Sequence, residues 1–157
     1  MKTKRETSNL QRPTPNIEWD RDGIRINESS NAEYGTRKNP QYDLENRLLD
    51  FAVNVVELTE SLPSTRAGNH IAGQLLRCGT SPLSNHGEVE AAESRKDFVH
   101  RLGICLKELR ETKRWLRLVH RLRKLSQAEN LPLCLNEVDQ LIRIFAASVR
   151  TAKDNEK

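Results

Sequence analysis

The stretch SRKDFVHRLGICLKELRETKRWLRLVHRLRKL, residues 94–125, is the part of this chain that determines its fold. Apolar and small side chains recur along it every three or four residues, the spacing that places side chains on one face of an α-helix. These residues are Phe98, Leu102, Cys105, Leu109, Thr112, Leu116 and Val119. The pattern predicts a helix of about 30 residues, roughly 45 Å long, that begins after the capping residue Ser94 and buries this face.

Basic residues follow the same helical spacing on another face of this helix. They are Lys107, Arg110, Arg114, Arg117, Arg121 and Lys124. Residues 94–125 hold eleven Lys and Arg against three Asp and Glu, a surplus of eight, whereas the whole chain has a net charge of +4. A row of like charges repels itself unless a polyanion or an acidic surface faces it. These six residues are therefore the candidate nucleic-acid-binding site, and a solvated charged face is the alternative.

Three further segments have helical periodicity. The first runs from Leu44 to Leu62 and ends before Pro63; the second starts at the cap Ser64; the last follows Pro132. We expect Pro82 to kink or end the second helix, because proline removes a backbone donor and clashes with the preceding turn. Residues 83–92 are ambiguous, with Gly87 as a turn. Together these patterns predict an all-α protein, an antiparallel up-down four-helix bundle over residues 41–153.

Residues 1–40 differ in composition from the rest. They contain three prolines and many Asn, Ser and Thr, and they have no helical periodicity. The stretch IEWDRDGIRIN, residues 17–27, has a weak hairpin pattern around Asp22 and Gly23. We expect a mostly irregular N-terminal extension that is flexible or that a partner orders, with Trp19 as a docking residue.

No known catalytic pattern occurs in the chain. It has no Gly-rich phosphate loop, no HExxH and no GxSxG sequence, so we expect that it is not an enzyme. Cys78, Cys105 and Cys134 are too widely spaced for a metal site, and we expect buried thiols and no cofactor. His86 is expected to be structural or solvated. No run of 18 apolar residues and no signal peptide is present, which favours a cytoplasmic protein.

Three residues of the helix expected over 94–125 have two interpretations each. For Gly103, packing of a neighbouring helix is favoured over contact with a phosphate. For Trp115, a position beside the core or in an oligomer contact is favoured over stacking on a base. For Glu111, local ion pairs with Lys107 or Arg114 are slightly favoured over a bridge to Arg77 on another helix.

Several segments resemble a known family of small four-helix-bundle proteins. They are QLLR (74–77), SPLSN (81–85) with Glu88, AESRKDF (92–98) and LGICLKELRET (102–112). The family is known from open reading frames in intervening sequences of bacterial 23S ribosomal RNA, and the accessory variability determinant of diversity-generating retroelements looks like a relative. The resemblance spans residues 43–152 and departs from the family pattern at HGEV (86–89). The first 40 residues have no identified counterpart.

The resemblance implies a ring-shaped homopentamer with a basic surface and no catalytic activity. For the retroelement relative it also implies binding of nucleic acid and of a reverse transcriptase. The leading hypothesis is therefore a non-enzymatic accessory protein that binds RNA or DNA through the six basic residues as a homo-oligomeric platform, and that assists a reverse transcriptase if the chain belongs to a retroelement. The alternative is a protein–protein interaction adaptor whose basic helix docks an acidic partner.

Overall fold

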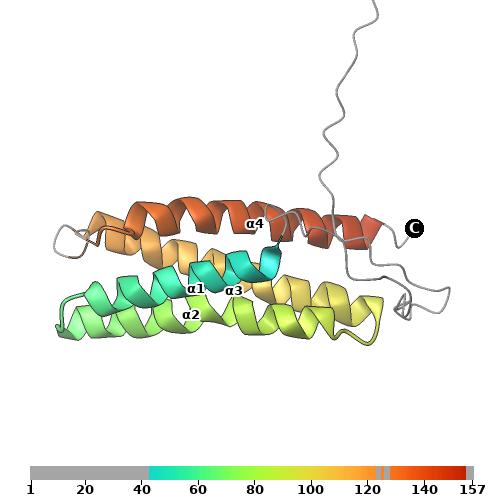
Figure 1. The fold of residues 1–157 in the computed structure, drawn as a ribbon, viewed down its shortest axis with the longest axis horizontal. Coiled ribbons are helices and arrows are strands. Elements are labelled where there is room, and N and C mark those ends of the chain that lie inside the picture. Colours follow the sequence, from blue (N-terminus) through green and yellow to red (C-terminus); the bar gives the residue numbers. More distant parts are fainter. Residues whose placement is uncertain (1–42, 123–124, 126–127, 155–157) are drawn as a thin grey trace, which may run out of the picture.

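The computed structural model describes residues 43–122, 125 and 128–154, which form four helices (Figure 1). The helices are α1 (Leu44–Ser61), α2 (Arg66–Glu90), α3 (Arg95–Arg121) and α4 (Leu131–Asp154). Successive helices run in opposite directions, so the described part of the chain is an all-α, up-down bundle, as predicted. Residues 1–40 lie outside the described part, and the domain boundary near residue 40 stays a prediction.

The helices form a ring in chain order. α2 packs against α1 and α3, α4 packs against α3, and α1 and α4 share the smallest contact. The α1/α2 side and the α3/α4 side are consequently opposite faces of the bundle. α1 is also the shortest helix, and it stops short of the end of the bundle at which α2 connects to α3 (Figure 1).

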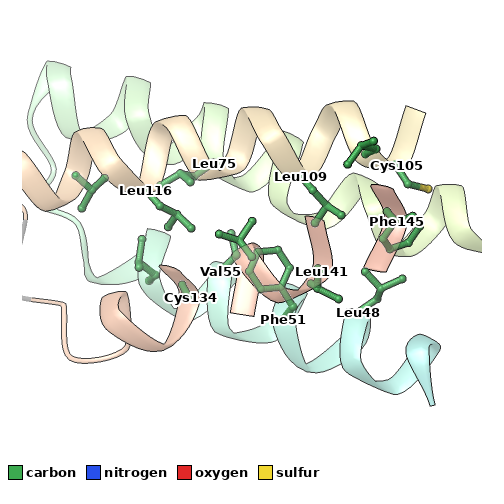
Figure 2. Close-up of a cluster of buried hydrophobic side chains, with 14 of the residues drawn as sticks. Leu48, Phe51, Val55, Leu75, Cys105, Leu109, Leu116, Cys134, Leu141 and Phe145 are labelled. Atoms are coloured by element: carbon green, nitrogen blue, oxygen red, sulfur yellow. The ribbon is translucent and has the colours of Figure 1, made fainter. Parts of the chain in front are cut away.

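The core is built from apolar side chains of all four helices. Figure 2 shows Phe51 and Val55 of α1, Leu109 of α3, and Leu141 and Phe145 of α4 pointing into one interior cluster. Every residue of the apolar stripe predicted for residues 98–119 is buried. Burial of such side chains is the main favourable contribution to folding, since each contributes about 1.5–3 kcal/mol.

At Gly79, α2 approaches α1 closely. A Cβ atom on Gly79 would lie 2.6 Å from Cγ1 of Val55 on α1, so only the absence of a side chain lets these helices pack at this distance. The contact fixes the position of α1 against α2, and with it the arrangement of the α1/α2 face.

The helix starts follow from capping side chains, with one correction to the prediction. Asp43 caps α1 by accepting a hydrogen bond from the backbone N–H of Asn46. α2 is capped by Thr65, whose hydroxyl oxygen accepts from the N–H of Gly68 at 3.0 Å, and not by Ser64. Both residues have cap chemistry and are adjacent in the chain, so their side chains alone do not distinguish them.

α2 continues through Pro82 to Glu90, so the expected break at Pro82 and the expected turn at Gly87 are wrong. The proline ring is buried against the neighbouring helices, and the packing that holds α2 on both of its sides outweighs the lost backbone hydrogen bond. Gly87 is exposed and simply extends the helix. The second helix is therefore longer than predicted and covers α3 over most of its length.

Candidate nucleic-acid interface

α3 begins where the sequence predicts. The Ser94 hydroxyl oxygen accepts a hydrogen bond from the N–H of Asp97, and the Asp97 carboxylate lies in the first turn, where it interacts favourably with the helix dipole. The helix then continues for 27 residues. Because one face of this helix is buried, the basic residues of the opposite face are held in a straight row.

The structure places five of the six predicted residues on the surface of α3. Lys107, Arg110, Arg114, Arg117 and Arg121 are all exposed. They lie away from α2, on the side of α3 that borders α4. The sixth residue, Lys124, lies outside the described residues.

The exposed row differs in its ion pairing from Arg101 and Lys113 of the same helix. Arg101 pairs with Asp97 at 2.8 Å and with Glu88 of α2, and Lys113 pairs with Asp139 of α4 at 2.5 Å. Among the described residues, none of the five basic residues of the row has a carboxylate within 4.0 Å. Their charges are therefore not neutralised within the described bundle.

α4 adds basic residues to the same side of the molecule, which the sequence analysis missed. The Lys113–Asp139 pair shows which face of α4 borders α3. Arg143, Arg150 and Lys153 follow Asp139 by 4, 11 and 14 residues, so they lie on that face, and all three are exposed. Their spacing is visible in the sequence, but it becomes meaningful only when the position of Asp139 is known.

Two contacts between α3 and α4 set the levels of these residues along the bundle. Arg95 at the start of α3 donates two hydrogen bonds to the Ala152 carbonyl oxygen, at 2.7 and 3.1 Å, and Lys113 meets Asp139 further along. In this antiparallel register Arg143 lies near the level of Lys107, and Arg150 lies closer to the start of α3. We call these two rows together the basic face. Its residues are Lys107, Arg110, Arg114, Arg117 and Arg121 of α3 and Arg143, Arg150 and Lys153 of α4.

Glu111 does not form the local ion pairs that the sequence analysis favoured. It pairs instead with Arg77 of α2, which also lies 3.6 Å from Oε2 of Glu108. Glu108 is 8% exposed, and Arg77 is the cation that balances its buried carboxylate. Glu108 and Glu111 therefore both face α2, so they leave the charge of the basic face undiminished.

The Trp115 side chain of α3 lies away from the basic face. Trp115 packs against the core, and its ring meets His70 of α2 edge-on at a centroid distance of 5.8 Å. A position beside the core, as predicted, is confirmed. His86 likewise packs edge-on against the buried Phe145 ring, at 6.2 Å, which fits a structural role.

Gly103 lies in line with the basic row, four residues before Lys107. A Cβ atom at this position would have no neighbour within 4 Å, so the favoured interpretation, packing of another helix of this chain, is wrong. Glycine in a helix interior costs about 1 kcal/mol relative to alanine. Here no contact within the described bundle offsets that cost.

The three cysteines are buried and form no disulfide, as predicted for core thiols. Burial raises the pKa of Cys78 and Cys134 to about 11 and that of Cys105 to about 12, so at neutral pH all three stay protonated and unreactive. The described residues contain no group of three His, Cys, Asp or Glu placed to hold a metal ion. None of the four helices is both long and apolar enough to cross a membrane.

Comparisons with known proteins agree on one family. Residues 41–147 match the family described as 23S rRNA-intervening sequence protein. A crystal structure from Bacteroides thetaiotaomicron, of a protein of unknown function from the S23 ribosomal protein family, is 32% identical to this chain. That match covers 68% of this chain and 97% of the other, with a TM-score of 0.61. Among curated proteins, none matches.

Proposed function

The chain belongs to the 23S rRNA-intervening sequence protein family, and we propose that it is a non-enzymatic accessory protein that binds nucleic acid through its basic face. The observation that carries this proposal is the absence of ion pairs for the α3 row within the described bundle, while neighbouring basic residues of the same helix are paired. Nucleic-acid phosphates are the polyanion that such a row fits. The name of the family, which refers to ribosomal RNA, is consistent with this chemistry.

The mechanism follows from the charges. Each Lys or Arg that neutralises a phosphate releases condensed counterions, so the affinity falls as the salt concentration rises. Phosphate contacts carry no base information, so binding is largely independent of sequence. The basic face thus acts as an electrostatic platform, and neither a metal ion nor a bound cofactor is needed for this role.

The α4 residues provide a specific test of the face as a two-helix site. In the variant Arg143→Gln with Arg150→Gln, the affinity should fall roughly 30-fold and the slope of log affinity against log salt should decrease by about two, since each lost phosphate contact removes close to one unit. Fluorescence anisotropy with a labelled duplex measures both quantities. An unchanged slope would restrict the site to α3.

The matched control lowers the net charge equally at a distant place. Arg66→Gln with Asn69→Asp changes two exposed residues at the start of α2, away from the basic face. This variant should bind nearly as the parent protein does, because long-range charge contributes less than direct contacts at moderate salt.

We further propose that the protein acts as a homo-oligomer, with a homopentamer as the expected form. An apolar strip on α1 supports self-association: Leu49, Val53 and Val56 are exposed and share one helix face, and Leu76 of the neighbouring helix α2 is exposed as well. Exposed apolar side chains gathered in this way are typical of interaction surfaces. Because the strip is opposite the basic face, subunits that meet through it keep their basic faces accessible.

Substitution of Val53 tests this assembly. Val53→Asp should convert the oligomer to monomers in light-scattering measurements coupled to size exclusion, because a buried unpaired carboxylate opposes association. Leu133→Asp is the matched control: Leu133 of α4 is 54% exposed, against 48% for Val53, and it lies outside the strip, so this variant should keep the parent's mass. A monomeric parent protein would contradict the proposed assembly.

Assistance to a reverse transcriptase is a finer proposal that rests on the family resemblance. If the partner is an acidic protein and not nucleic acid, the basic face serves as an adaptor surface. A pull-down after nuclease treatment separates the two functions, since an adaptor retains its protein partner and an electrostatic nucleic-acid platform loses the bound polymer.

A further inference from the structure

The basic face is a straight array of two staggered rows, which overlap only near Lys107 and Arg143. The α3 row spans 14 residues from Lys107 to Arg121, about 21 Å at the helical rise of 1.5 Å per residue. The α4 row continues from the Lys107 end of the α3 row toward the start of α3, and it is offset sideways by the 8–10 Å axis separation that is typical of packed helices. Because Arg150 lies near the start of α3, the two rows together extend over roughly 30 Å.

This array has the dimensions of a short length of double helix. With phosphates every 3.4 Å of axis on each strand, roughly 30 Å corresponds to about nine base pairs. A duplex is itself a straight rod with phosphates along its whole length, so it can meet the α3 row and the offset α4 row at once without bending. A single strand must first be held extended along the row, which lowers its conformational entropy.

The face also lacks the feature that single-strand-binding proteins use. In such proteins the bases stack on exposed aromatic rings, and this stacking supplies much of the affinity. Among the described residues, Phe51, Phe98 and Phe145 are buried, and Trp115 is packed between the core and His70. The described part of the basic face therefore offers charges to phosphates but no Phe, Tyr or Trp ring to an unpaired base.

Gly103 adds to this arrangement. It lies between the level of Lys107 and that of Arg150, and the space where its side chain would be is open. The surface of α3 therefore has a shallow depression at Gly103, with Lys107 of α3 on one side of it and Arg150 of α4 on the other. A sugar–phosphate backbone can approach the helix more closely here than at any position that carries a long side chain.

We infer that the basic face binds the phosphate backbone of double-stranded nucleic acid in preference to single strands. This inference rests on the proposed function and specifies its substrate class. The preference comes from the match between a straight, staggered array of cations and a rigid duplex, together with the lack of an exposed Phe, Tyr or Trp ring on the described part of the face.

The test compares probes that carry equal charge. The full-length protein is titrated by fluorescence anisotropy, at one fixed salt concentration, with a duplex of about 20 base pairs and with an unstructured thymidine or uridine strand of about 40 nucleotides, which has a similar number of phosphates. The expected result is that the duplex binds at least about tenfold more tightly. An abasic strand of the same length as the thymidine strand should bind as that strand does, because no base stacks.

The possible results distinguish this inference from the function on which it rests. Equal or tighter binding of the single strand, or a clear loss of affinity when its bases are removed, would overturn the duplex preference and leave nucleic-acid binding intact. No binding to any probe at low salt would overturn both. Both duplex RNA and duplex DNA belong in the series, because phosphate contacts do not distinguish them.

Discussion

Simultaneous replacement of Arg110, Arg114 and Arg117 by glutamine should lower the affinity for nucleic acid by roughly 100-fold, with each lost phosphate contact contributing about 1 kcal/mol. Among the described residues, none of these guanidinium groups is paired with a carboxylate, so their removal leaves no acidic group unbalanced. Glutamine also forms helices well, and the fold should be preserved. Circular dichroism checks the helix content, and anisotropy measures the affinity.

A control with the same change in net charge separates contact from overall charge. Arg66→Gln with Ala67→Glu and Asn69→Glu alters exposed residues in the first turns of α2, where acidic groups suit the helix dipole. It should lose at most a few-fold in affinity at moderate salt. If both variants weaken binding equally, the interaction depends on net charge alone and the basic face is not the site.

Gly68→Ala should destabilise the fold by about 1–3 kcal/mol, the usual effect of adding a methyl group where there is no space. A Cβ atom at this position would lie 2.0 Å from the carbonyl oxygen of Pro63, a backbone atom of the α1–α2 turn that cannot rotate away. The turn must therefore shift to admit the methyl group. This shift disturbs a second contact, because the same Pro63 oxygen accepts a hydrogen bond from the N–H of Thr65 at 2.7 Å. Denaturant unfolding measures the free-energy change.

The same substitution at Gly103 should have the opposite effect on stability and raise the free energy of unfolding. Its Cβ position is open, so alanine only improves helix propensity, and the protein without nucleic acid should gain about 0.5–1 kcal/mol. If Gly68→Ala leaves the free energy of unfolding unchanged, the α1–α2 turn does not pack closely on Gly68 of α2. If Gly103→Ala is strongly destabilising, a contact from another subunit covers the helix there.

The sequence was sufficient for the features that depend on a single helix. The buried stripe from Phe98 to Val119 and the exposed row from Lys107 to Arg121 both follow from one periodicity, and both are found as predicted. The start of α3 at Ser94 follows from local capping chemistry in the same way. In each case the information lies within a few residues of the feature.

The features that the sequence did not predict depend on which helices are neighbours. Arg77 pairs with Glu111 because α2 packs on α3 in one particular register, and the α4 basic residues join the face because Asp139 meets Lys113. Packing on both sides of α2 also holds Pro82 within a helix against its intrinsic preference. Periodicity gives the faces of each helix, but not the alignment of one helix with the next.

The most direct test of nucleic-acid binding through the basic face is to measure the binding of the purified, nuclease-treated protein to labelled RNA and DNA over a series of salt concentrations. If the basic face binds phosphates, the protein should bind at low salt, and log affinity should fall steeply and linearly with log salt, with a slope of about −0.9 per neutralised phosphate for a duplex. Because the α3 row alone holds five unpaired cations, that slope should be several units. No binding at low salt, or binding that does not change with salt, would contradict the assignment of the basic face to nucleic acid.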